Sequence, residues 1–184
     1  MAATSATDLV QDASFLRTDA HWRQNDAVID LDGADRAILT ELQRDGRMTV
    51  AELAERIHLS SSAVLRRMRR LEASGVIDRY VMLVDRGAVG RPTSVFVEIS
   101  LTSQHEDMLD AFEAAVAACP EVMSCHLMSG QYDYLLHVAV ADVADYERVH
   151  RSYLAVLPGV AQLRSSFALR TVLDETAYDL DTVT

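Results

Sequence analysis

The stretch TVAELAERIHLSSSAVLRRMRRLEASG, residues 49–75, decides the fold of the N-terminal half of the chain. Thr49 is followed three residues later by Glu52, which is the pattern of a capping box at the start of a helix. Ser60 is a second N-cap residue, and Gly75 suits the left-handed position that follows a helix. The stretch therefore predicts two consecutive helices joined by a tight turn.

A third helix precedes these two. Asp32 with Asp35 three residues later marks its start, and Gly46 ends it. Three short capped helices in this order predict a helix-turn-helix domain over residues 31–80. Residues 76–84 are rich in β-branched and apolar side chains and predict a β-rich stretch after the third helix.

The helix that begins after Ser60 has two different faces when its residues are spaced about 100° apart. One face is apolar and predicted to pack inward: Val64, Leu65, Met68 and Leu71. In a helix-turn-helix, the N-terminal residues of the second helix of the pair enter the major groove. The residues predicted to contact DNA are Ser61, Ser62, Ala63, Arg66, Arg67, Arg69 and Arg70.

Arg66 lies one turn into this helix, where a guanidinium can fork onto the O6 and N7 of guanine. The later arginines are placed to reach phosphates. The simpler reading of an arginine run is a solvated surface face, and basic runs alone are weak motifs. The two capped helices and the tight turn in front of this run favour DNA binding.

Charge distribution supports the same segment. The net charge of the 184 residues is −11, which argues at first against a nucleic-acid partner. Nine arginines against eight acidic residues nevertheless give residues 32–80 a net charge of +1, whereas residues 91–184 carry −9. No run of eighteen apolar residues and no signal peptide is present, so we expect a cytoplasmic protein with no membrane partner.

The C-terminal half predicts an α+β domain. Strands are expected over residues 94–101, 122–129, 133–140 and 162–173, and helices over 106–119 and 142–157. This βαββαβ order is that of a ferredoxin-like domain. The expected organisation is a flexible tail (1–30), a winged helix-turn-helix domain (31–80), a linker including a connecting strand (81–92), a sensing and dimerisation domain (93–175) and a C-terminal tail (176–184).

Alternation along the predicted strands separates two faces of the sheet. The face expected under the helices carries Val95, Val97, Ile99, Leu101, Met123, Cys125, Leu127, Tyr134, Leu136, Val138, Leu163, Phe167 and Leu169. The other face carries Phe96, Glu98, Ser124, His126, Met128, Leu135, His137, Arg164, Ser166, Ala168 and Arg170. This second set is too apolar for open water and too polar for a core, so we expect it to form a two-fold interface in a homodimer.

The N-terminal stretch LDGADRAILTELQRDGRMTVAELAERIHLSSSAVLRRMRRLEASGVI, residues 31–77, resembles the helix-turn-helix of the Lrp/AsnC (feast/famine) regulators. The resemblance continues through VMSCHLMSGQYDYLLHVAV (122–140) and LPGVAQLRSSF (157–167). It implies a transcriptional regulator that dimerises through its sheets, often assembles further, and binds an amino acid at a subunit interface. Many family members have proline at the start of the recognition helix, whereas this chain has Ser61 and Ala63, so the operator sequence does not transfer.

In the family, the effector lies near a hairpin whose residues here are expected to be Met128, Gly130, Gln131, Tyr132, Asp133 and Leu135. Gly130 would let backbone amides approach a carboxylate, and Asp133 would pair with an ammonium group. Met128, Tyr132 and Leu135 would contact the ligand side chain. The alternative from the residues alone is a turn glycine followed by a turn-capping aspartate.

Metal and cofactor sites are not expected. Cys125, His126 and His137 lie near one another in the predicted hairpin, but alternation points the cysteine and the histidines to opposite faces. Two other functions stay open beside the non-enzymatic regulator. One is an enzyme resembling the siroheme decarboxylases, which share this architecture and would use His126, His137 and Arg164. The other is an architectural protein that coats DNA with little sequence preference.

Overall fold

The computed structural model describes residues 30–180. They form two compact units, one made of residues 84–171 and the other of residues 30–83 together with 172–180. The tail expected over residues 1–30 lies outside the described residues except for Asp30. Within this part of the chain, no helix has the length and apolar character needed to cross a membrane.

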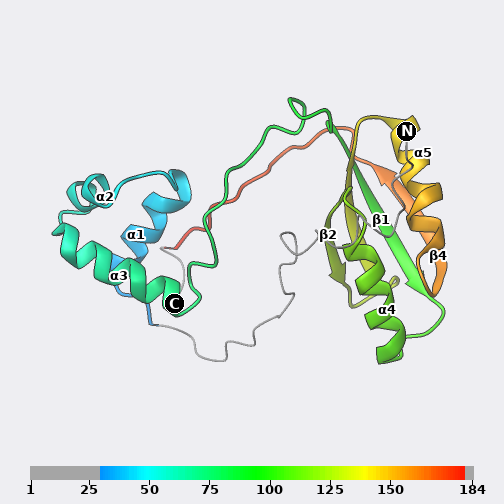
Figure 1. The fold of residues 1–184 in the computed structure, drawn as a ribbon, viewed down its shortest axis with the longest axis horizontal. Helices are drawn as coiled ribbons and strands as arrows, with labels where there is room; N and C mark the ends of the chain where they lie inside the picture. Colours follow the sequence, from blue (N-terminus) through cyan, green and yellow to red (C-terminus); the bar gives the residue numbers. More distant parts are fainter. Residues whose placement is uncertain (1–29, 181–184) are drawn as a thin grey trace, which may run out of the picture. The chain divides into compact units, whose positions relative to one another are not determined.

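The unit that contains residues 30–83 is helical, with α1 (Gly33–Arg44), α2 (Val50–Arg56) and α3 (Ser61–Ala73) (Figure 1). The expected caps are confirmed: Asp32 with Asp35 and Thr49 with Glu52 both form complete capping boxes. Ser60 caps α3 by accepting a hydrogen bond from the backbone N–H of Ala63, and Gly75 has a positive φ of 76°. A small apolar core joins the three helices through the buried side chains of Ile38, Leu39, Leu53, Ala54, Val64 and Leu71.

The β-rich stretch expected over residues 76–84, and the connecting strand expected in the linker, are wrong for this structure. Residues 76–92 form no strand. The side chains of Val81, Met82 and Leu83 are 67%, 83% and 70% exposed. A strand exists only when its backbone groups pair with a neighbour, and no described strand of the chain pairs with this segment.

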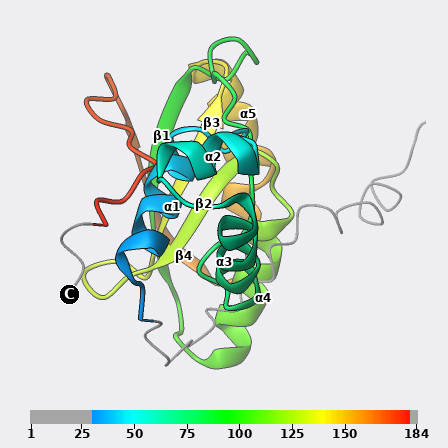
Figure 2. The same cartoon turned by 90° about the vertical axis from the view of Figure 1, so that its left-hand side faces the viewer.

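The unit of residues 84–171 is a four-stranded antiparallel sheet with two helices. Its elements are β1 (Thr93–Leu101), α4 (Glu106–Ala117), β2 (Val122–Leu127), β3 (Tyr134–Val140), α5 (Val143–Ser152), a 3₁₀ turn η2 (Leu154–Val156) and β4 (Val160–Phe167). The strand order is β2-β3-β1-β4, which confirms the ferredoxin-like βαββαβ prediction. Both helices of this unit cover the same face of its sheet, and neither of them lies over the opposite face (Figures 1 and 2).

The helix-covered face forms the core, with Val95, Val97 and Ile99 of β1 and Leu136 and Val138 of β3 fully buried. The alternation argument is wrong at two positions of β2. A register shift between Val122 and Ser124 turns Met123 out of the pattern, and 58% of its surface is exposed. Leu127, also expected on the helix-covered face, pairs with Tyr134 but is 62% exposed, because it is the last residue of the edge strand β2.

The last strand is shorter than its sequence predicts. β4 ends at Phe167, and the backbone N–H of Ala168 donates to Ser94 before the chain leaves the sheet. Leu169, expected on the core face, is therefore fully exposed. The expected strand over residues 162–173 is wrong in its second half because β1 begins at Thr93 and offers no further residues for pairing.

Residues 172–180 return to the helical unit. The Gln43 side chain on α1 donates from Nε2 to the Tyr178 carbonyl (3.2 Å) and accepts from the Tyr178 N–H at Oε1 (2.7 Å). Leu180 packs against the apolar core of the same unit. A glutamine that satisfies both backbone groups of one residue acts as a short substitute for strand pairing. The helical unit is therefore built from two segments that lie far apart in the sequence.

We expect Gln43→Ala to lower the free energy of unfolding by about 1 kcal/mol, because it removes two hydrogen bonds that are partly exposed to water. Denaturant unfolding followed by circular dichroism measures the effect. Arg44→Ala is the control, since Arg44 is exposed and its ion pair with Glu41 is a loose one of 3.6 Å. Equal stability of the two variants would show that residues 172–180 are not held on α1 in solution.

Candidate DNA-binding surface and effector pocket

The outward face of α3 is set by the residues on its inward face. Val64 and Leu71 are fully buried in the helical core, which fixes the rotation of the helix about its axis. Ser61, Ser62, Arg66 and Arg69 are all exposed, whereas Ala63 is half-buried. Leu65, expected inside, is 38% exposed, because it lies one residue beyond Val64 and thus at the flank of the buried stripe.

The other two arginines of α3 are tied to the start of α1. Arg67 donates from Nη1 to Asp32 (2.7 Å) and to Asp35 (2.8 Å), and Arg70 forms an ion pair with Asp35 through Nη2. The Asp35 side chain has no exposed surface, and those of Arg67 and Arg70 are 23% and 51% exposed. These arginines therefore hold α3 against α1, a role that the sequence analysis missed because their partners lie more than thirty residues away.

Arg66 and Arg69 differ from that pair. Neither makes an ion pair or side-chain hydrogen bond with any residue that the structure describes. Together with the hydroxyl groups of Ser61 and Ser62, they form an accessible polar surface near the start and middle of α3. The structure thus brings the predicted DNA-contacting residues onto one helix but divides their arginines into two available cations and two that already have partners.

The ion pairs also affect titration. The backbone N–H of Asp35, followed by the Arg67 guanidinium, holds the pKa of Asp32 at about 2, below its ordinary value of 3.8. Hydrogen bonds to the carboxylates of Asp32 and then Asp35 raise the pKa of Arg67. Because the folded state binds the Asp32 proton less tightly than the unfolded state, this carboxylate stabilises the fold above pH about 4, and the contribution is lost as the pH falls towards 2.

The hairpin between β2 and β3 is held by Asp133. Its Oδ2 accepts from the backbone N–H of Leu101 (2.7 Å) and its Oδ1 from Nε2 of Gln104 (2.5 Å). Across the loop, the Met128 N–H donates to the carbonyl of Asp133 (2.8 Å). Both carboxylate oxygens therefore have protein partners, and an ammonium contact to Asp133 would compete with them. That contact stays a prediction.

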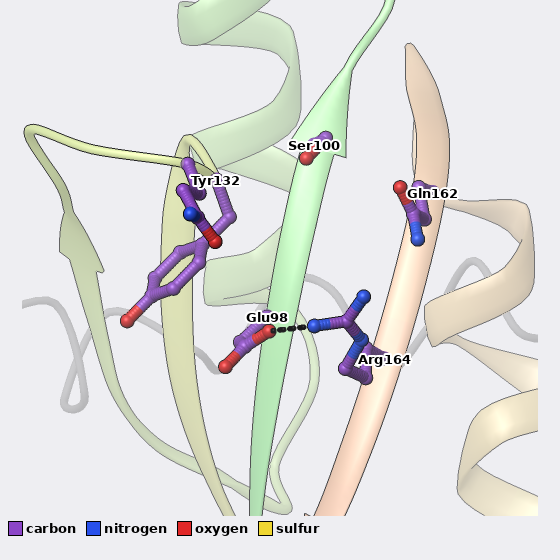
Figure 3. Close-up of a pocket in the computed structure, with 6 residues that line it drawn as sticks. Glu98, Ser100, Tyr132, Gln162 and Arg164 are labelled. Carbon is purple, nitrogen blue, oxygen red and sulfur yellow. Dashed lines mark hydrogen bonds and ion pairs between the residues drawn. The ribbon is translucent and has the colours of Figure 1, made fainter.

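A small pocket of about 60 Å³ lies on the open face of the sheet next to this hairpin (Figure 3). Its lining is polar: Glu98, Ser100, Gln131, Tyr132, Gln162 and Arg164. Only Gln131 and Tyr132 of the six predicted effector residues line it. Leu135 lies beside it in register with Glu98, whereas Met128, Gly130 and Asp133 lie outside the lining.

The remaining pocket residues come from the central strand β1 and its neighbour β4, which forms an edge of the sheet. Glu98 of β1 is paired in register with Arg164 of β4, and Ser100 with Gln162. Sequence alternation placed Glu98 and Arg164 on the open face but did not connect them to the hairpin. That connection depends on the packing of the hairpin over β1, where the N–H of Asp133 donates to the carbonyl of Ile99 (2.9 Å).

The rest of the open face is partly apolar. Phe96 is 41% exposed and stacks on His137 with a ring distance of 5.1 Å. His137 also contacts the Ser94 hydroxyl at 3.0 Å, and Arg86 donates to the same hydroxyl at 2.8 Å. No three His, Cys, Asp or Glu side chains among residues 30–180 are grouped in a way that could hold a metal ion.

An outward basic helix on a three-helix unit, joined to a ferredoxin-like domain with a polar pocket, defines a two-domain regulator that binds DNA and a small ligand. Comparison with known families supports this class: residues 31–78 match the winged helix-turn-helix DNA-binding family, and residues 94–178 match the Lrp/AsnC ligand binding domain. The chain belongs to the Lrp/AsnC family of transcriptional regulators.

Individual relatives agree with this assignment. The chain is 40% identical to the Bkd operon transcriptional regulator of Pseudomonas aeruginosa over 82% of its own length and 99% of the relative. It is 41% identical to the leucine-responsive regulatory protein of Escherichia coli K12, over 78% and 87%. Its fold is similar to a transcriptional regulator of Neisseria meningitidis in complex with L-methionine, with a TM-score of 0.78, 34% identity and coverage of 83% and 98%.

We expect Asp32→Asn to destabilise the protein at neutral pH and to have no effect near pH 2. Asparagine retains the capping hydrogen bond but not the charge that faces Arg67. The difference in unfolding midpoint between the wild type and the variant should therefore close as the pH falls from about 4 to about 2. Urea unfolding at several pH values measures it, with Asp78→Asn, which removes an exposed carboxylate, as the control. A gap that does not change with pH would contradict the ion-pair assignment.

Proposed function

We propose that this protein is a sequence-specific DNA-binding transcriptional regulator, without catalytic activity, whose DNA binding is modulated by an amino acid bound between the C-terminal domains of a homodimer. The observation that carries the proposal is the orientation of α3. Val64 and Leu71 are buried, whereas its serines and the two arginines that have no side-chain partner among residues 30–180 are exposed. In a surface helix that binds no ligand, nothing would require two arginines to stay exposed and unpaired while the other two form ion pairs.

For DNA, we propose that Ser61, Ser62 and Ala63 enter the major groove, since their small side chains permit close approach. Arg66, one turn further along, reads a base edge, and Arg69 binds the phosphate backbone. Arg67 and Arg70 lie at the edge of the contact surface, where Asp32 and Asp35 already neutralise part of their charge. They act mainly by fixing the angle at which α3 meets the duplex.

For assembly, we propose a two-fold dimer through the open face of the sheet. This face combines Phe96, Leu135 and His137 with the charged side chains of Glu98 and Arg164. A self-complementary interface suits such a mixture, because a two-fold axis brings each apolar patch and each charge to the same surface of the other copy. The two copies of α3 would then reach half-sites spaced by a whole number of duplex turns.

For the effector, we propose a site at the hairpin made by Met128, Gly130, Gln131, Tyr132, Asp133 and Leu135. The contacts of Asp133 fix the loop shape, and a Cβ placed on Gly130 would meet no heavy atom within 4 Å, so space is open beside it. Support comes from the match to the Lrp/AsnC ligand binding domain and from the L-methionine bound to the Neisseria relative. An effector at this position would lie where the two sheets meet.

We expect Arg66→Ala to weaken binding to a specific site by about 1 to 3 kcal/mol and to relax base preference. Arg69→Ala should weaken specific and non-specific binding alike and reduce the salt dependence, because a phosphate contact carries no sequence information. Footprinting and mobility-shift titrations against competitor DNA measure both. Arg151→Ala, on the exposed surface of α5, is the control. Continuous protection without discrete half-sites would instead support an architectural DNA-coating protein.

We expect one or more amino acids to raise the melting temperature of the protein, since a ligand that binds only the folded state stabilises it. A thermal-shift screen of all the standard amino acids tests this, beginning with L-methionine and L-leucine. The effector should also change the DNA affinity in a mobility-shift titration. A spectral change and a decarboxylated product on addition of siroheme, with no response to amino acids, would overturn the proposal in favour of an enzyme.

A further inference from the structure

Few contacts hold residues 172–180, the C-terminal strap, on the helical unit. The Gln43 side chain pairs with the backbone of Tyr178 through two hydrogen bonds of 2.7 and 3.2 Å, and Leu180 is half-buried against the apolar core. Every other side chain of the strap is exposed, including its large apolar ones. Segments with so little buried surface open at low cost in free energy, so the strap can leave α1 while the three helices stay folded.

The strap changes the charge of the helical unit. Residues 30–83 contain nine arginines and nine acidic residues, so their formal net charge at pH 7 is zero. The strap adds three acidic residues and no basic one: Asp174, Glu175 and Asp179. With the strap in place, the described part of the unit that carries α3 therefore has a net charge of −3.

The charges of the strap act on DNA because the helical unit is small. A unit of roughly sixty residues has a radius of gyration of roughly 10 to 11 Å, and the Debye length is about 10 Å at 0.1 M salt. A charge anywhere on such a unit contributes to the potential that a duplex meets as it approaches Arg66 and Arg69. Since phosphate neutralisation supplies much of the affinity for DNA, the docked strap opposes binding.

The strap stays near α1 even when its contacts break, because it belongs to the same chain. Residues 168–177 connect Phe167, the last residue of β4, to Tyr178 and its contact with Gln43. Covalent attachment gives the strap a high effective concentration at α1, so two hydrogen bonds and one leucine are enough to return it. Docking of the strap and approach of a duplex are therefore two competing equilibria within one molecule.

We infer that the C-terminal strap is an autoinhibitory segment: when it is docked on α1 through Gln43, its three carboxylates repel the phosphate backbone and lower the affinity of α3 for DNA. The inference rests on the DNA binding of the proposed function and adds a way in which the chain itself limits that binding. By linkage, whatever releases the strap strengthens DNA binding, and DNA in turn favours the released strap.

The test is a fluorescence-anisotropy titration of the full-length protein with a labelled random-sequence DNA duplex at about 50 mM and about 200 mM salt. We expect the triple variant Asp174→Asn, Glu175→Gln, Asp179→Asn to bind about three- to tenfold more tightly than the wild type at the lower salt concentration. The difference should shrink at the higher concentration, because screening shortens the range of the repulsion.

A second variant tests the docking contact itself. Gln43→Ala leaves the three carboxylates in the chain but removes the hydrogen bonds that hold the strap on α1, so it should also strengthen binding at low salt. Added to the triple variant, Gln43→Ala should change the affinity little further, because both changes remove the same repulsion.

The matched control is Glu106→Gln, Asp107→Asn, Asp110→Asn, which removes three exposed carboxylates of α4 and changes the charge of the whole protein equally. This control should bind the duplex like the wild type. Equal strengthening in the control, or unchanged affinity in either the triple variant or Gln43→Ala, would overturn the inference and leave the proposed function intact. If neither the wild type nor any variant binds DNA, the proposed function fails together with the inference.

Discussion

The buried carboxylate of Asp35 is the constraint on which the DNA-binding surface depends. A charge without access to water is very costly unless opposite charges and hydrogen bonds surround it. Asp35 receives Arg67 and Arg70 from α3, while its own backbone N–H caps α1 through Asp32. The start of α1 and the middle of α3 are therefore held together by ion pairs whose separation would cost a large amount of free energy. The exposed position of Arg66 and Arg69 follows from this arrangement.

The two faces of the sheet in residues 84–171 also differ in what they contribute. Its inner face is apolar and covered by α4 and α5, and it provides the stability of the domain. Neither helix of this unit covers its outer face, which contains an aromatic stack, a loosely held ion pair and the side of a hairpin loop. Groups that contribute little to folding are free to bind something else, and this physical difference makes the outer face the place to look for ligand and subunit contacts.

Much of this architecture could be predicted from short-range patterns. Helix caps depend on residues three apart, so Thr49, Glu52 and Ser60 reveal the helix starts directly. The predictions failed where the structure depends on a neighbour that the sequence does not identify. Residues 76–84 have the composition of a strand but no pairing partner among the described residues, and the strand beginning at Val160 ends near the point where its antiparallel partner β1 begins. Met123 leaves the alternation because of a register shift that no local pattern announces.

By itself, the sequence determined the order of helices and strands, the serine-rich start of α3, the arginines that follow it, and the glycine and aspartate of the hairpin. These features arise from the conformational preferences of residues close together in the chain, and such preferences can be recognised from the spacing of residue types. Only the tertiary structure decided which arginines have partners, that Asp133 is occupied by Leu101 and Gln104, that Gln43 holds Tyr178, and that Glu98 faces Arg164 beside the hairpin. Each of these depends on a contact between residues far apart in the chain, which exists only once the elements have packed.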